Sequence, residues 1–468
     1  MIKKLIQTAI EKPKWIMGLT VLAVLIAGFQ FPRIKVDTDP ENMLPADAPV
    51  RVFHKEVKKE FALYDFVVLG IVNDKHPQGV FNIDTLTKIY RLTEDIKKID
   101  GVMGYEMMAP STKDNIEQDG IGAVRFNWLM EAPPNTEEEA LHIRQEAQDH
   151  PMFNGTIVSE DGRMLSLYIP IEKKSLSYEV AQDIRALLKN YQGDEEYHIT
   201  GLPVAEDQFG VEMFKQMAVS APLAGLIIFL LMWWFFKSAL LITAPMIVAL
   251  VTVITTMGLL IGFGFPVHIM SSMIPIFLMP IAVLDSVHIL SEFFDYYPKF
   301  KSRRKTLNFV IDELFQPMLF TSLTSAVGFF SLSFSPIPPV QVFGVYVAIG
   351  VMMAWVLTML FIPAYIMLIK EEKLKHFGRQ PSDEGKKHFI DHVLNGLKTL
   401  SVKHFPSVLI FTVIVVGVSL YGISRIQVND NPVRWFTAKH PIRVADKILN
   451  KHFAGTYEAY LVMESLDE

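Results

Sequence analysis

The clearest absence from this chain is cysteine, which occurs nowhere among its 468 residues. Without a thiol, the chain can form no disulfide, no cysteine-based zinc site and no cysteine nucleophile. An extracytoplasmic domain that has no disulfide fits a bacterial periplasm more easily than a eukaryotic secretory lumen.

The chain also lacks the short motifs of nucleotide-driven and hydrolytic proteins. It contains no G-x-x-x-x-G-K-[ST] phosphate loop, no G-x-S-x-G elbow and no H-E-x-x-H pair. Its 13 histidines show no spacing typical of a metal site, and a net charge of −6 gives no reason to expect a nucleic-acid partner. We therefore expect no enzymatic activity and no cofactor, and any energy-dependent step would draw on an ion gradient or a partner.

Long apolar runs are what the chain has instead. Half of its residues are hydrophobic and 20% are charged, a mixture typical of a membrane protein with a large water-exposed part. The first run, 15–31, follows several lysines and is either a signal peptide or an uncleaved helix. The absence of a small-x-small cleavage site favours the helix. Six more runs lie near 217–236, 239–262, 270–294, 316–335, 340–370 and 405–423.

These runs divide the chain into six predicted parts. A cytoplasmic N-terminus with the first membrane helix covers 1–31, an outer domain 32–212 and five membrane helices 213–370. A linker covers 371–404, a seventh membrane helix 405–423, and the start of a second outer domain 424–468. Lys and Arg gather at the N-terminus, after the fourth run and in the linker, so the positive-inside rule places these in the cytoplasm and 32–212 outside.

The outer domain alternates strand and helix patterns. Residues 65–72, 163–171 and 197–201 are typical of strands, and 83–99 and 178–191 have helical spacing. Thr136 and Glu139 form a capping box that opens another helix. Two split βαβ units would give an α+β, ferredoxin-like domain beside an α-helical membrane bundle.

The sequence around residue 33 returns near residue 425. RIKVDTDPENMLPADAPVRVF, residues 33–53, aligns without a gap to RIQVNDNPVRWFTAKHPIRVA, residues 425–445. Such a repeat indicates duplication of a unit of one helix, one outer domain and five helices. We expect the chain to be truncated inside its second unit. The alternative is a genuine half-length protein with a short tail. The identical positions are Arg33, Ile34, Val36, Pro40, Ala46, Pro49, Arg51 and Val52.

The residue with the strongest functional signal is Asp285, at the middle of the fourth run. A carboxylate at the centre of a membrane helix costs roughly 2.5–3.5 kcal/mol on insertion scales, so it usually faces protein or water and serves a function. His288 follows at i+3 and Glu292 at i+7, which predicts one helix face that could carry protons. The alternative is a buried polar group that a neighbouring helix satisfies.

The fifth run offers hydroxyl groups as relay partners for Asp285, unless these small residues only pack helices. Pro275 and Pro280 precede Asp285 and predict a helix break beside an ion site, or ordinary kinks. The possible relay partners are Ser286, Glu292, Thr321, Ser322, Thr324 and Ser325.

Taken together, these features resemble the RND superfamily, in its MMPL-like, sterol-sensing-domain (Patched-like) branch. Ala282–His288 is similar to that family's signature, with Ser286 where a tyrosine is usual, and the stretch TSLTSAVGFFSLSFSPIPPVQVFGVYVAIG resembles its fifth and sixth spans. The resemblance implies proton-driven export or shuttling of lipids or other hydrophobic compounds across or out of a bacterial inner membrane. It implies Asp285 as proton carrier, a matching Asp in the second unit, and membrane lipids and periplasmic accessory proteins as partners.

Two other functions stay open at this point. The chain could be a sterol-sensing-like receptor or scaffold that binds lipid without transport, or an auxiliary of protein translocation. Asp285 and His288 favour a proton-coupled device over a passive sensor.

Overall fold

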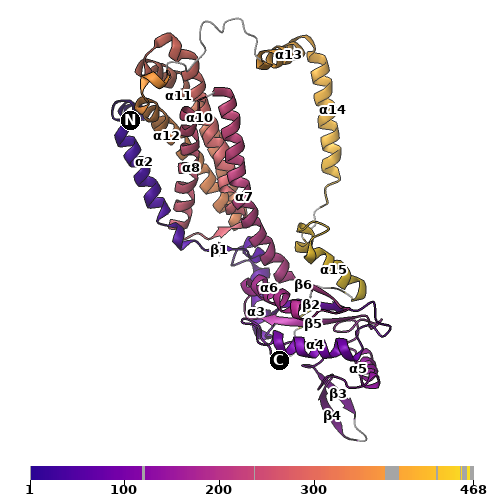
Figure 1. Ribbon diagram of the computed structural model, residues 1–468. Helices are drawn as coiled ribbons and strands as arrows, with labels where there is room; N and C mark the ends of the chain where they lie inside the picture. The colour runs from indigo at the N-terminus through magenta and orange to yellow at the C-terminus, as the bar shows by residue number, and fades with distance from the viewer. Residues whose placement is uncertain are drawn as a thin grey trace.

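The computed structural model describes residues 2–118, 122–236, 238–374, 389–427, 431–453, 455 and 461–463. It consists of a helical bundle, a mixed α/β region at one end of the bundle, and a helix, α14 (Phe405–Ser424), that stands apart from the bundle (Figure 1). Residues 375–388 of the expected linker lie outside the described residues.

In the described part of the chain, seven helices are long and apolar enough to cross a membrane, which confirms the seven predicted runs. Shorter helices and short strands lie between them or in the α/β region, as given below. The seven helices are α2 (Pro13–Gly28), α7 (Leu202–Phe236), α8 (Ala239–Gly262), α10 (Ile274–Phe300), α11 (Arg303–Phe330), α12 (Pro338–Leu368) and α14.

The helices α8, α10 and α12 form the centre of the bundle, and α2, α7 and α11 lie around them. At two of the contacts between these helices, a glycine allows the helices to approach closely. Gly258 of α8 faces the backbone of Ala27 in α2, and Gly350 of α12 faces Leu278 of α10. Short helices α1 (Ile2–Glu11), α9 (Ile269–Ser272) and α13 (Phe389–Lys403) complete the membrane part.

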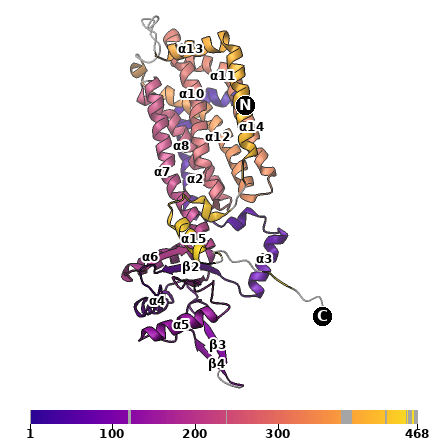
Figure 2. The same ribbon diagram turned by 90° about the vertical axis from the view of Figure 1, so that its right-hand side faces the viewer.

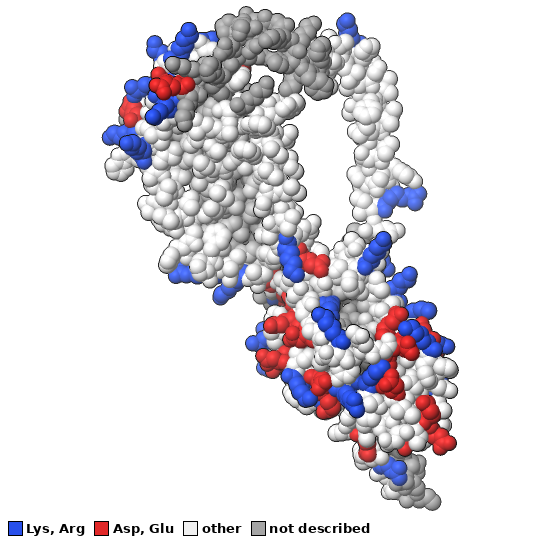
Figure 3. Space-filling view, in the orientation of Figure 1, with Lys and Arg blue, Asp and Glu red and all other residues white. Residues whose placement is uncertain are grey.

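Charged side chains lie at the two ends of the bundle and over the α/β region, and an uncharged band separates them (Figure 3). At the end remote from the α/β region, Arg303 of α11 pairs with Glu371 and Arg304 with Glu11 of α1. This distribution is what a membrane-spanning bundle requires, because charge is expensive in the hydrocarbon layer.

The α/β region is built on a three-stranded antiparallel sheet. The central strand β2 (Asp65–Val72) pairs with β5 (Met164–Ile171) on one side and with β6 (Glu196–Thr200) on the other. Helices α4 (Ile83–Ile96), α5 (Glu137–Asp149) and α6 (Ser177–Leu187) connect and cover it. The side chain of Thr136 caps α5 by accepting from the Glu139 amide at 3.2 Å, which confirms the predicted cap.

The mixed α/β character is confirmed, whereas the ferredoxin-like arrangement stays a prediction. That arrangement has a fourth strand, which would lie at the free edge of β5. At this edge the described residues form isolated bridges, Val102 to Ile171 and Met108 to Tyr168.

Two pairs of short strands were not expected from the sequence. A hairpin of β3 (Asp114–Gln118) and β4 (Val124–Trp128) projects from the far end of the α/β region (Figure 1). Near the bundle, β1 (Val36–Asp37) pairs in parallel with β7 (Val267–His268), which ties the segment after α2 to the loop after α8.

The repeated sequence adopts the same elements twice. In the first copy, a 3-10 turn, η2 (Pro40–Met43), precedes α3 (Pro49–Glu60). In the second copy, η8 (Pro432–Trp435) precedes α15 (Pro441–His452). Every boundary is displaced by the same number of residues, so the duplication extends to local structure.

Candidate functional site

Asp285 lies halfway along α10 and is buried, with 5% of its surface exposed. Pro275 occupies the first turn of α10, where a missing amide hydrogen is harmless. Pro280 lies inside the helix, which nevertheless runs continuously from Ile274 to Phe300. The expected helix break beside Asp285 is therefore absent from the described chain, although proline still removes one backbone hydrogen bond there.

The carboxylate of Asp285 has a polar partner on the neighbouring helix. The Ser322 hydroxyl of α11 donates a hydrogen bond to Asp285 Oδ2 at 3.0 Å, and both residues are buried. No Lys or Arg within the described ranges forms an ion pair with Asp285. The arrangement therefore holds a carboxyl group in the bundle with a neutral donor and without a fixed counter-charge.

Ser286, next to Asp285, faces a different helix. Its hydroxyl donates to the Ala282 carbonyl at 3.0 Å and lies 3.2 Å from the Thr358 hydroxyl of α12. Ser286 thus joins α10 to α12. It occupies the position at which the signature described above usually has a tyrosine. Thr358 was not among the predicted residues; its signal in the sequence is that it is the one Ser or Thr of a largely apolar helix.

His288 and Glu292 are less enclosed than Asp285. His288 is exposed on the surface of the bundle, and Glu292 is half-buried. Neither forms a hydrogen bond or an ion pair in the part of the chain that is described. His288 lies roughly 60° around α10 from Asp285, on a part of the helix that is exposed.

Of the predicted hydroxyls in the fifth span, Ser322 alone bonds to Asp285 among the described residues. Thr321 is exposed and donates to the carbonyl of Pro317 in its own helix at 2.8 Å. Thr324 is exposed as well and donates to the Thr321 carbonyl at 2.9 Å. Ser325 is half-buried.

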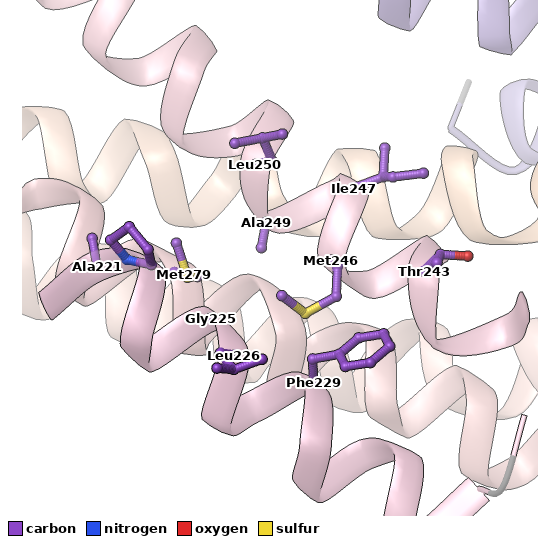
Figure 4. Close-up of a pocket in the computed structure, with 11 residues that line it drawn as sticks. Ala221, Gly225, Leu226, Phe229, Thr243, Met246, Ile247, Ala249, Leu250 and Met279 are labelled. Atoms are coloured by element: carbon purple, nitrogen blue, oxygen red, sulfur yellow. The ribbon is translucent and has the colours of Figure 1, made fainter. Parts of the chain in front are cut away.

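A second feature of the bundle is an apolar groove between α7 and α8, with a volume of about 460 Å³. Met246 and Phe229 lie across it from each other, and Met279 of α10 closes one part (Figure 4). Among the residues that line the groove, Thr243 carries a hydroxyl group, which already bonds to the Leu240 carbonyl and the Tyr365 hydroxyl. The lining residues are Ala221, Pro222, Gly225, Leu226, Phe229, Thr243, Met246, Ile247, Ala249, Leu250 and Met279.

The junction between the bundle and the α/β region carries a charge cluster around Lys174. The Lys174 ammonium group lies 2.7 Å from Glu206 Oε2, 2.9 Å from Asp39 Oδ1 and 3.3 Å from Glu41 Oε1. Burial lowers the pKa of Lys174, but the attraction of Glu206 and Asp39 outweighs it and leaves that pKa above its usual value. Beside it, Asp207 accepts from the Thr38 hydroxyl at 2.9 Å and from the Tyr178 amide at 3.1 Å.

Within the described ranges, no group of three or more His, Asp or Glu side chains is placed to hold a metal ion.

Comparison with known proteins gives two matches. The model of the MMPL family matches residues 42–388. The chain is also similar to the membrane protein MJ1562 of Methanocaldococcus jannaschii, with 22% identity over 377 residues. This stretch covers 78% of the chain and 93% of that archaeal protein.

Proposed function

Because the chain belongs to the MMPL family of the RND superfamily, whose members are generally non-enzymatic transporters of hydrophobic compounds, we propose that it is a proton-coupled exporter or shuttle of lipids. Asp285 is the proton carrier of this unit. The chain is a multi-pass membrane protein, and we place it in a bacterial inner membrane with its N-terminus in the cytoplasm.

The observation that carries this proposal is the environment of Asp285. Burial of a carboxyl group without a counter-charge disfavours its charged form and so makes protonation easier than in water. The Ser322 hydroxyl can donate to the carboxylate, as it does here at 3.0 Å, or accept from the protonated acid. Asp285 can therefore exist in both protonation states in one geometry, which a proton carrier requires.

The other polar groups of α10 have supporting roles in this proposal. His288, one turn along the helix, passes protons between Asp285 and the bundle surface, and Glu292 lies one further turn along. Ser286 holds α10 against α12 through Thr358. A movement of α10 on protonation of Asp285 would therefore also move α12.

The outer domain, residues 32–212, lies in the periplasm in this proposal and has the ferredoxin-like arrangement. The orientation is supported by the end of the bundle remote from the domain, where Arg303 and Arg304 lie and where Lys and Arg side chains gather (Figure 3). Lysine and arginine are enriched on the cytoplasmic side of membrane proteins.

One observation favours a second function, a lipid-binding receptor or scaffold without transport. The groove between α7 and α8 is lined almost wholly by apolar side chains and is large enough for part of a lipid. A receptor needs this groove and does not need a titrating Asp285.

The decisive experiment reconstitutes the purified protein into liposomes with a fluorescently labelled phospholipid. We expect lipid movement to depend on a pH gradient and to fall by at least about tenfold in Asp285→Asn, since the amide cannot exchange a proton. Asp295→Asn is the matched control, because Asp295 is an exposed carboxylate of the same helix.

Two outcomes contradict the proposal. Gradient-dependent lipid movement that survives in Asp285→Asn removes Asp285 from the mechanism. A wild-type protein that binds a photoactivatable lipid in the groove, yet moves no lipid under any gradient, is a receptor.

A further inference from the structure

The connection between α10 and α11 lies at the end of the bundle that is remote from the α/β region (Figure 2). Two residues, Lys301 and Ser302, separate the two helices. Both helices are candidate membrane spans, so the end that they share lies at the level of the lipid headgroups. The side chains exposed at this corner are therefore presented to lipid as well as to water.

Five cationic residues occur between positions 299 and 305, and two of them have carboxylate partners. Arg303 pairs with Glu371 at 3.2 Å, and Arg304 pairs with Glu11 at 2.9 Å. The other three are exposed and form no ion pair with any residue that the structure describes; they are Lys299, Lys301 and Lys305. The corner thus carries positive charge that the described chain does not neutralise.

Lys301 has an unusual backbone conformation for a lysine. Its φ is 47° and its ψ is 27°, in the left-handed region. Helices commonly end in this conformation, but the residue is usually glycine, because a side chain is disfavoured there. A residue that is kept in a disfavoured conformation points to a function. Here the lysine adds an ammonium group to the corner.

Three aromatic rings form a cluster beside these lysines. The ring of Tyr296 lies 4.6 Å from that of Phe309 between ring centres, and Phe300 lies 5.5 Å from Phe309. The Lys299 ammonium group lies 4.7 Å from the centre of the Tyr296 ring. Phe300 is 39% exposed and Phe309 is 37% exposed. An apolar surface that spans both helices therefore adjoins the cations.

An anionic phospholipid is the ligand that complements both parts of this surface. Lysines near a membrane surface attract lipids with acidic headgroups. The upper part of the acyl chains can pack on the exposed rings and remove them from water. A water-soluble anion would match the charge alone and leave the aromatic cluster bare.

We propose that this surface, the basic corner, binds the headgroup of an anionic phospholipid from the adjacent leaflet. The bound lipid contacts the ends of α10 and α11, the helices that carry Asp285 and Ser322, and holds them together. Binding does not require that the protein transports lipid, so this site and the proton carrier can be tested separately. The basic corner consists of Tyr296, Lys299, Phe300, Lys301, Lys305 and Phe309.

Because the chain has no cysteine, one introduced thiol can carry a fluorophore at the basic corner. Asn308→Cys, at an exposed position of α11 next to Phe309, is labelled in the purified protein and reconstituted into phosphatidylcholine vesicles. Brominated phosphatidylglycerol or brominated phosphatidylcholine is then added as a quencher. We expect half-maximal quenching at an about tenfold or more lower mole fraction of the anionic lipid, since each lysine near the membrane surface strengthens binding by about fivefold.

Two double variants in the labelled protein separate a site from general surface charge. Lys301→Gln/Lys305→Gln removes two cations of the basic corner. Lys398→Gln/Lys403→Gln is the matched control, because it removes two exposed lysines of α13 at the same end of the molecule (Figure 1). We expect the first variant to lose the preference for phosphatidylglycerol by about tenfold or more and the control to retain it.

Three results overturn the proposal. A wild type that is quenched equally by the two lipids has no such site. An equal loss of preference in both double variants would mean that only the general surface charge attracts the lipid. Release of phosphatidylglycerol by inorganic phosphate, at an ionic strength at which chloride has no effect, would identify a site for a free anion.

Discussion

At the scale of single residues, the depth of Asp285 could be predicted from the sequence, but its partner could not. The sequence offered four hydroxyl residues of the fifth span as partners, and Ser322 is the one that bonds to Asp285. The face that α11 turns to α10 depends on packing between helices. Thr321 and Thr324 bond to carbonyls of their own helix, an alternative open to any membrane-helix hydroxyl.

His198 of β6 is a residue whose behaviour follows from its surroundings. Burial lowers the pKa of His198, and Glu196, 3.7 Å away, opposes this only in part. The unfolded chain therefore takes up a proton at a higher pH, near ~6.5, than the folded one. We expect stability to fall as the pH drops below ~6.5 and to level off below the folded-state pKa.

Thermal unfolding of the purified protein between pH 8 and 5 measures this dependence. His198→Gln should flatten it, whereas His142→Gln, which changes an exposed histidine of α5, should leave it intact. Equal slopes for the wild type and His198→Gln would show that His198 contributes nothing to it.

At the scale of elements, hydrophobic runs and caps were reliable guides. Strand β2 occupies the predicted residues 65–72, and α4 begins at the predicted Ile83 because Asn82 caps it through the Thr85 amide. The hairpin β3–β4 and the pair β1–β7 escaped prediction. The strands β3 and β4 carry polar residues at many positions, so they lack a clear strand pattern. The strands β1 and β7 have two residues each and come from segments that tertiary structure brings together.

The contact between α8 and α2 depends on Gly258. A Cβ at this position would lie 2.6 Å from the Ala27 carbonyl oxygen and 2.8 Å from Ala27 Cα, both backbone atoms that cannot turn aside. We expect Gly258→Ala to push α2 away from α8 and to lower the free energy of unfolding by about 1–3 kcal/mol, the usual effect of overpacking. Thermal unfolding in detergent measures the loss.

Gly328→Ala is the matched control, because a Cβ at this position of α11 meets no atom within 4 Å. Alanine has the higher helix propensity, so this variant should be as stable as the wild type or slightly more stable. If Gly258→Ala behaves like Gly328→Ala, the two helices do not depend on this close approach.

At the scale of the whole molecule, three segments meet where the bundle joins the outer domain. The segment after α2 brings Asp39, the turn before α6 brings Lys174, and the first turns of α7 bring Glu206 and Asp207. Because α7 continues from this junction through the bundle as one helix, the cluster joins a membrane helix directly to the outer domain.

From the contacts at the junction, we expect replacement of Lys174 to lower the stability strongly and replacement of Lys75 to change it little. Lys174→Met keeps the length of the side chain but leaves the buried carboxylate of Glu206 without its cation. Removing one partner of a buried pair typically costs about 3–5 kcal/mol. We expect Lys174→Met to lower the free energy of unfolding by an amount near the lower end of this range, because Lys174 retains some contact with solvent. Lys75→Met removes an exposed pair with Asp194 and should change the stability by less than ~1 kcal/mol.

The double variant Lys174→Met/Glu206→Gln separates charge from packing. If the cost of Lys174→Met arises from the stranded carboxylate, replacing Glu206 by its neutral counterpart should restore much of the lost stability, because no buried charge then lacks a partner. Denaturant unfolding of the two variants beside Lys75→Met measures this recovery. A double variant that is no more stable than Lys174→Met would mean that Lys174 holds the junction by its contacts with Asp39 and Glu41, so that the outer domain is joined to the segment after α2 more firmly than to α7.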